Sequence, residues 1–159
     1  MTRYVKQRDE TSCGPVAIIN IFKWMDCKIS YNEFIHVARF MCKHEPGIYG
    51  GTTNLGQEQA LSKLGIKKKR RIKPSIKEID RHLDNGGAVL LGYHIPFAVP
   101  GFRKSEGHFA LCIGRTQRSY IMVNDGTKYT VGKRSRYVMK RILQGAAFIP
   151  CWAWLISKD

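Results

Sequence analysis

The stretch Gln7-Arg-Asp-Glu-Thr-Ser-Cys13-Gly-Pro15 leads into a run whose apolar residues recur at helical spacing. Those residues are Val16, Ile18, Ile19, Phe22 and Met25. Proline suits the first turn of a helix, where its missing N–H breaks no bond, so we predict a helix over residues 13–25. Cys13 then lies at the helix N-terminus, where unpaired N–H groups and the helix dipole favour negative charge. Such a position can lower a thiol pKa to roughly 3.5–7.5, which creates a thiolate nucleophile at neutral pH.

The other cysteines have a different context. They lie in or beside apolar segments, and we interpret them as small core residues: Cys27, Cys42, Cys112 and Cys151. A total of five cysteines, in a chain that opens without a secretory signal, argues against a disulfide framework. Because the sequence lacks CxxC and HxxxH pairs, we expect neither a metal site nor a cofactor.

Further helices are predicted in the first half of the chain, and strands in the second. Capping-box pairs or a terminating glycine place helices over residues 30–42, 55–64 and 75–84. Short apolar runs bounded by turn residues predict strands over 88–93, 108–114 and 119–124. We also expect a strand at 129–131, a basic helix at 133–143 and a last strand at 146–156, interrupted by Pro150. Helices followed by strands indicate the α+β class, here as a single domain over residues 1–159.

A general base is predicted at His108, the first residue of one of these strands. If residues 108–114 and 119–124 form a hairpin, His108 lies opposite Asp125 or Gly126. Cross-strand neighbours have Cβ atoms about 4.5–5.5 Å apart, so Asp125 can hold the imidazole in the tautomer that a base needs. Gln7, on the extended segment before Cys13, can supply an amide donor to an oxyanion. Nucleophile, base and orienter together are typical of thiol catalysis.

These residues resemble the papain-like cysteine peptidases that process bacteriocin leader peptides at double-glycine sites. The opening from Gln7 to Pro15 matches that family's Q-x5-C-G-P motif. Gly51-Thr52-Thr53 and residues 60–65 resemble its middle helix, and residues 76–91 resemble its next helix and strand. Residues 108–114 and 120–125 resemble its His strand and its Asp strand.

The resemblance implies a papain-like α+β fold, with an N-terminal helical lobe packed on a C-terminal antiparallel sheet. It implies that Cys13 is the nucleophile, His108 the general base, Asp125 the orienter and Gln7 the oxyanion donor. The substrate is then a peptide or protein; isopeptide cleavage or acyl transfer would use the same intermediate. The family has proline after the catalytic aspartate where this chain has Gly126, which leaves Asn124 as an alternative orienter. Many relatives are fused to a transporter that is not seen in this sequence, so whether this chain would cleave at double-glycine sites stays open.

Charge gives a competing interpretation. Lys and Arg number 27 against 12 Asp and Glu, a formal charge of +15, and residues 63–77 and 127–141 hold most of the excess. A catalytically weak or inactive module on the same fold could bind nucleic acid or an acidic protein through these stretches. The side chains expected to make that contact are Lys67, Lys68, Lys69, Arg70, Arg71, Lys133, Arg134 and Arg136.

Hydropathy argues against a membrane span. The longest apolar stretch, residues 145–156, is shorter than the roughly 20 residues that a bilayer requires. The first ten residues carry charge and are followed by no apolar signal region. We therefore expect a cytoplasmic peptidase, and its small size and basic character suit a phage or bacterial protein.

Overall fold

The computed structural model describes residues 4–9, 11–45, 51–94, 107–145 and 149–158. Its helices are α1 (Cys13–Trp24), α2 (Tyr31–Met41), α3 (Asn54–Lys63), α4 (Ile76–Asp84) and α5 (Arg136–Gln144). Its strands are β1 (Lys68–Ile72), β2 (Ala88–His94), β3 (Gly107–Arg115), β4 (Ser119–Val123), β5 (Val131–Ser135) and β6 (Trp152–Ile156). No helix in these described ranges is long and apolar enough to cross a membrane.

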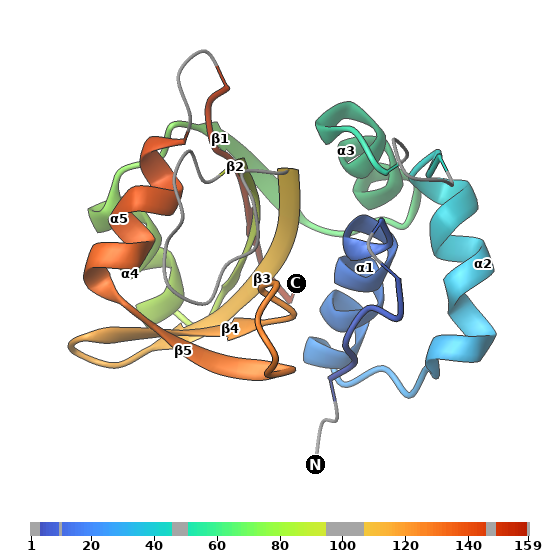
Figure 1. Ribbon diagram of the computed structural model, residues 1–159, viewed down its shortest axis with the longest axis horizontal. Helices are drawn as coiled ribbons and strands as arrows, with labels where there is room; N and C mark the ends of the chain where they lie inside the picture. The colour runs from blue at the N-terminus through green and yellow to red at the C-terminus, as the bar shows by residue number, and fades with distance from the viewer. Residues whose placement is uncertain (1–3, 10, 46–50, 95–106, 146–148, 159) are drawn as a thin grey trace.

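The strands form one antiparallel sheet in the order β1-β6-β2-β3-β4-β5. Helices α1, α2 and α3 lie on one side of this sheet, and α4 and α5 lie on the other (Figure 1). Successive strand residues point to opposite faces, so Leu90 and Leu111 pack against the first helical group, whereas Val89 and Cys112 pack against the second. The α+β, papain-like architecture expected from the sequence is confirmed.

Side-chain caps explain where four of the helices begin. Ser30, Thr53, Ser75 and Ser135 each have an extended backbone and accept a hydrogen bond from a backbone N–H in the first turn of the next helix. Such caps satisfy N–H groups that have no partner within the helix. The helix starts predicted at Ser30 and Ser75 are confirmed, since each serine side chain accepts a hydrogen bond from the N–H of Glu33 or Glu78.

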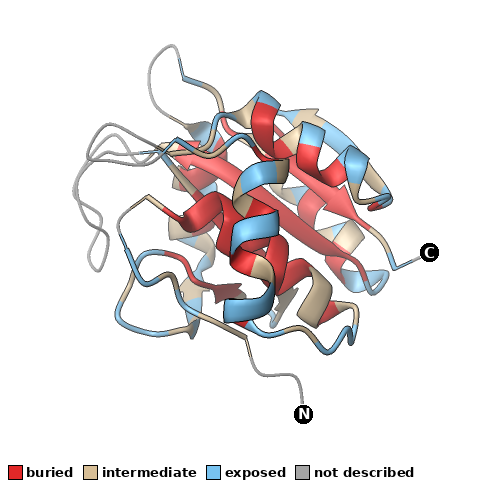
Figure 2. Cartoon of the chain, turned by 90° about the vertical axis from the view of Figure 1, so that its right-hand side faces the viewer, coloured by how far each residue is buried: buried red, intermediate tan, exposed pale blue. Residues whose placement is uncertain are grey.

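Helix α1 is the most buried of the helices. Ten of its 12 residues are buried, including Cys13 and Trp24, and it packs against β3 on one side and α2 on the other. The exposed surfaces of the helical group face outward, and the buried surfaces face the sheet (Figure 2). The apolar content of the helix therefore fixes its N-terminus against the start of β3.

Both basic stretches contain an edge strand that differs from the prediction: β1 was not predicted, and β5 was predicted at other residues. The run at residues 67–71 forms most of β1, and β5 occupies Val131–Ser135 instead of 129–131. Helix α5 consequently begins at Arg136, three residues later than predicted, because Ser135 caps it. Charged side chains on edge strands hinder pairing with other chains. Hydrophobic periodicity misses such strands, because neither face carries an alternating apolar pattern.

The last strand is shorter than predicted. We expected it over residues 146–156 with an interruption at Pro150, and β6 covers Trp152–Ile156. Residues 146–148 lie outside the described part of the chain. Strand β6 pairs with β1 and β2, so its segment joins the basic edge to the centre of the sheet.

One polar network fastens α4 and α5 to the sheet. The Asp80 carboxylate of α4 accepts hydrogen bonds from the Tyr120 hydroxyl at 2.6 Å and from Arg136 Nη1 at 2.9 Å. Tyr120 is buried in β4, with 1% of its surface exposed. Loss of the carboxylate would leave a buried hydroxyl without its acceptor.

We predict that Asp80→Ala lowers the free energy of unfolding by about 1–3 kcal/mol, because it leaves buried polar groups unpaired. Urea denaturation followed by circular dichroism measures the change. Asp84→Ala is the matched control, since Asp84 binds Arg115 through a more exposed carboxylate. An equal loss in the two variants would contradict this role for the network.

Candidate active site

Cys13 is the first residue of α1, and its thiol is hydrogen-bonded to the His108 side chain. The backbone N–H groups of Gly14 and Phe109 also donate to this sulfur. Burial raises the pKa of the Cys13 thiol, but the hydrogen bond and charge of His108, with the two N–H groups, outweigh it. The pKa therefore lies below its ordinary value, which favours a thiolate.

His108 lies at the start of β3, and its Nε2 is 2.7 Å from the Asn124 carbonyl oxygen. A carbonyl oxygen only accepts hydrogen bonds, so Nε2 carries the proton and Nδ1 is left to meet Cys13. Burial lowers the pKa of His108, but the hydrogen bond and charge of Cys13, followed by the Asn124 carbonyl and Asp125, raise it above its ordinary value. The two shifts together favour a thiolate beside an imidazolium.

Tyr93 forms a wall beside the imidazole. It is paired with His108 across β2 and β3, and the two rings meet edge to face with centroids 5.9 Å apart. Only 2% of the Tyr93 surface is exposed, and its hydroxyl lies 3.5 Å from the Asp125 carbonyl oxygen. An apolar wall of this kind limits water around the pair and strengthens its electrostatic attraction.

Asn124 connects His108 to the N-terminal segment. Its side-chain oxygen accepts a hydrogen bond from the Gln7 backbone N–H at 3.1 Å, and its side-chain nitrogen donates to Gln7 Oε1 at 2.9 Å. Asn124 is 2% exposed and has a φ of 52°. Asparagine tolerates this left-handed conformation better than most residues, and here it turns the backbone carbonyl toward His108 while the side chain holds Gln7.

The Asp125 carboxylate does not occupy the place that the sequence predicted. In the described part of the chain it accepts hydrogen bonds from Thr127 N at 3.3 Å, Thr127 Oγ1 at 2.8 Å and Arg134 Nε at 2.5 Å. The register Leu111↔Val123, extended along the hairpin, places Gly126 opposite His108. The Asn124 carbonyl therefore binds the imidazole, whereas Asp125 acts on it through its charge.

Gly126 explains one departure from the family pattern. Its φ of 91° is accessible to glycine, whereas the proline ring fixes φ near −65°. A Cβ added at Gly126 would lie 3.8 Å from His108 Nε2, which is ordinary van der Waals contact. The constraint at this position is thus conformational, and proline cannot make this turn.

Gln7 lies in the site through its contacts with Asn124, and its side-chain nitrogen donates to the Asp9 carbonyl oxygen at 2.9 Å. Asp9 in turn accepts from Ser12 Oγ at 2.8 Å. The segment that precedes α1 is thereby tied both to the helix and to the turn after β4. The sequence signal for Gln7 was its position before Cys13; the bridging role of Asn124 had no such signal.

The remaining cysteines do not share this environment. Burial raises the pKa of Cys42, and it raises the pKa values of Cys112 and Cys151 to about 12. Cys27 is exposed. Among the described residues, no group of three or more His, Cys, Asp or Glu side chains could hold a metal ion.

Several solved structures share this fold. The chain matches the peptidase domain of Streptococcus ComA, a bifunctional ABC transporter of a quorum-sensing pathway, with a TM-score of 0.68 and 20% identity over 98% of both chains. The chain has the fold of C39 peptidase domains. A putative C39-like peptidase from Bacillus anthracis matches with a TM-score of 0.63 and 14% identity, over 96% of this chain and 94% of the other.

A third match includes a bound peptide. It is a double-glycine motif protease from an AMS/PCAT transporter in complex with the leader peptide, with a TM-score of 0.64 and 15% identity over 98% of this chain and 91% of the other. No protein-family model matches the sequence, and no curated protein matches it significantly. The resemblance predicted from sequence motifs is therefore confirmed by structures of the C39 peptidase fold.

We predict that iodoacetamide modifies Cys13 near neutral pH faster than it modifies Cys42, Cys112 and Cys151, because the Cys13 pKa is lowered and the other three are raised. The experiment uses Cys27→Ser, which removes the exposed thiol, and peptide mass spectrometry from pH 5 to pH 10.

In the Cys27→Ser background, His108→Ala should move the pH dependence of Cys13 modification to higher pH. Burial then raises the thiol pKa without the opposing charge of His108. An unchanged profile would contradict the proposed pairing of thiol and imidazole.

Proposed function

We propose that the chain is a cysteine peptidase in which Cys13 is the nucleophile and His108 is the general acid and base. The observation that carries this proposal is the buried Cys13–His108 pair at the N-terminus of α1, with its two pKa values shifted in opposite directions. A nucleophile, a base and a group that orients the base are the components of thiol catalysis.

The reaction follows from these positions. The Cys13 thiolate attacks the carbonyl carbon of the scissile amide, and the His108 imidazolium gives its Nδ1 proton to the departing amine as the C–N bond breaks. Neutral His108 then takes a proton from water, which attacks the thioester and releases the carboxylic acid product. The C–S bond breaks as the product leaves, so the Cys13 thiolate is released beside the protonated His108 and the starting pair is restored. The Asn124 carbonyl keeps Nε2–H occupied throughout, so each proton transfer uses Nδ1.

Asp125 stabilises the imidazolium by its charge, and its bonds to Thr127 and Arg134 maintain the turn that directs the Asn124 carbonyl. Gln7 supplies the oxyanion donor. Its side-chain nitrogen, which binds the Asp9 carbonyl in this structure, changes partner when the substrate oxygen develops negative charge. A single donor of this kind contributes about 10²–10³ in rate in a studied protease.

The substrate is a peptide or protein. The similarity to a double-glycine motif protease bound to its leader peptide supports this class. Cleavage after a double-glycine motif is the first specificity to test, since small residues leave room beside a buried thiol.

The competing interpretation, an inactive module that binds nucleic acid or an acidic protein, has less support. Five of the eight basic residues assigned to such binding have partners within the chain. Lys68 donates to Ser62, and Arg70, Arg71, Arg134 and Arg136 pair with Glu58, Glu78, Asp125 and Asp80. Much of the charge in both stretches therefore serves the fold.

Proteomic identification of new N-termini tests the proposed function. A bacterial lysate is treated with the wild-type chain and, separately, with Cys13→Ala, which keeps the fold but lacks the nucleophile. We expect new N-termini with a shared sequence context in the wild-type sample alone. Identical termini in both samples would contradict peptidase activity, and ligated peptides without new termini would indicate acyl transfer.

We predict that Asp125→Asn moves the alkaline limb of the activity profile to lower pH. Activity requires thiolate and imidazolium together, so it is lost as pH rises through the raised pKa of His108, and removing the Asp125 charge lowers that pKa. A cleavable peptide found by the N-terminal experiment serves as the substrate.

Asn124→Gly is the matched comparison. It keeps the carbonyl and the left-handed φ but removes both side-chain bonds to Gln7. We expect the alkaline limb to stay in place while kcat falls about tenfold or more, because the oxyanion donor loses its support. A shift of the alkaline limb in Asn124→Gly, or no shift in Asp125→Asn, would show that the roles proposed for these two residues are wrong.

A further inference from the structure

Lys73 lies at the same level across the strands of the sheet as His108, the proposed base. Ile72 pairs with Trp152, and Trp152 pairs with Gly92, while the Lys73 N–H donates to the Cys151 carbonyl oxygen at 2.9 Å. Extending this register by one residue places Lys73, Cys151, Tyr93 and His108 across four neighbouring strands. Three strand spacings are about 14 Å, a span that four or five extended residues cover.

Lys73 has a backbone conformation that its residue type disfavours. Its φ is 52°, in the left-handed region, and its side chain is exposed. A lysine held in this region is strained, and glycine would relieve most of that strain. Glycine at this position would therefore remove the ammonium group without adding backbone strain.

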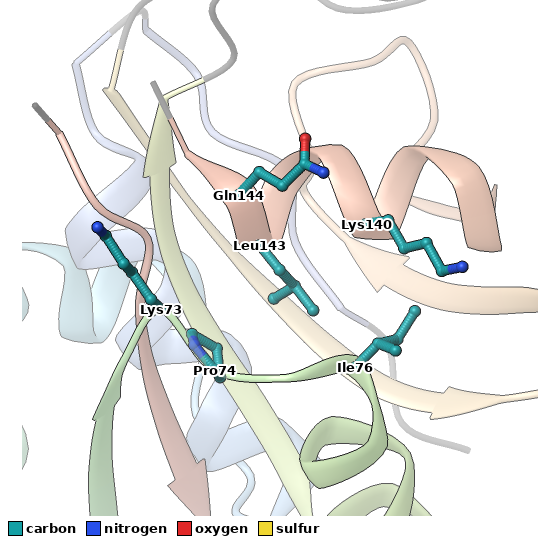
Figure 3. A pocket seen from close by; sticks show the side chains of 6 residues that line it. All are labelled: Lys73, Pro74, Ile76, Lys140, Leu143 and Gln144. Atoms are coloured by element: carbon teal, nitrogen blue, oxygen red, sulfur yellow. The ribbon is translucent and has the colours of Figure 1, made fainter. Parts of the chain in front are cut away.

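A shallow cavity of about 330 Å³ lies between the start of α4 and the end of α5. Its lining consists of two lysines, three apolar residues and one amide: Lys73, Lys140, Pro74, Ile76, Leu143 and Gln144. Figure 3 shows the apolar side chains between Lys73 on one side and Lys140 on the other. Each of the two basic stretches of the sequence thus contributes one lysine to this cavity.

Both lysines are exposed, and no ion pair within the described residues involves either of them. This separates them from four arginines of the same stretches, which are paired with Asp and Glu side chains: Arg70, Arg71, Arg134 and Arg136. Among the described residues, none that lines the cavity is acidic. Two ammonium groups beside an apolar floor complement an apolar side chain flanked by carboxylates.

We propose that this cavity is a specificity site for an acidic segment of the peptide substrate, separated by about four or five residues from the scissile bond. The segment places an apolar side chain over Pro74, Ile76 and Leu143, while carboxylates on either side meet Lys73 and Lys140. This assignment rests on the proposed peptidase function, since the segment belongs to the chain that Cys13 cleaves.

The shape of the cavity favours a polypeptide over nucleic acid. Its floor is apolar, and the described residues that line it include no aromatic ring on which a base could stack. Two isolated lysines also differ from a groove that follows a phosphate backbone. A side chain of leucine size flanked by acids fits both the floor and the charges.

Binding to the full chain carrying Cys13→Ala tests the site without turnover, so its outcome is independent of whether the wild type cleaves peptides. The probe is a fluorescein-labelled peptide, Gly-Ser-Gly-Glu-Leu-Glu-Gly-Ser-Gly, and its counterpart has glutamine in place of both glutamates. Fluorescence anisotropy at low salt measures the dissociation constant. We expect the acidic peptide to bind about tenfold more tightly than the glutamine peptide.

The variant Lys73→Gly/Lys140→Gln should lose about tenfold in affinity for the acidic peptide while its melting temperature stays the same or rises, because glycine relieves the left-handed φ of Lys73. The control Lys28→Gln/Lys63→Gln removes the same charge from exposed positions outside the cavity and should bind as the parent does.

Equal losses in the two double variants would overturn the proposal, since they would show a general effect of charge. Equal affinity for the two peptides would also overturn it. A single-stranded oligonucleotide that binds more tightly than the acidic peptide, and loses affinity in Lys73→Gly/Lys140→Gln, would assign the cavity to nucleic acid instead.

Discussion

The hydrogen bond between the Cys13 thiol and the His108 imidazole depends on the contact between α1 and β3, and it joins the helical lobe to the sheet. Each partner alone would resist ionisation, because burial raises the pKa of a thiol and lowers that of an imidazole. Together they stabilise each other's charge. The apolar face of α1 therefore does more than fill the core: it holds the helix N-terminus where the thiolate needs it.

The turn after β4 positions the other half of the site. The backbone of Asn124 orients the imidazole, its side chain holds Gln7, and Asp125 secures the turn through Thr127 and Arg134. In this arrangement the acidic residue contributes charge and local structure, and the hydrogen bond to the base comes from the neighbouring carbonyl. Gly126 completes the turn with a φ of 91°.

Strong local patterns made much of this fold predictable. The helix after Cys13 and the two serine capping boxes were found because apolar spacing and N-cap chemistry act over a few residues. The β3–β4 hairpin limited the partners of His108 to two positions, but a backbone carbonyl leaves no mark in a sequence. Strand β1 was missed and β5 was placed too early in the chain, because an edge strand of basic residues carries no apolar alternation.

The most direct test of the central claim is the protonation state of His108, followed by long-range ¹⁵N–¹H NMR of the imidazole during a pH titration. We predict that in the wild type the imidazolium persists to a pH above the ordinary histidine pKa, and that Nε2 keeps its proton when the ring becomes neutral. In Cys13→Ala the hydrogen bond and charge of the thiol are lost while the Asn124 carbonyl and Asp125 remain, so the pKa of His108 should fall relative to the wild type. A ring that is neutral at pH 6 in the wild type, or that titrates identically in both proteins, would contradict the pairing of a Cys13 thiolate with a His108 imidazolium.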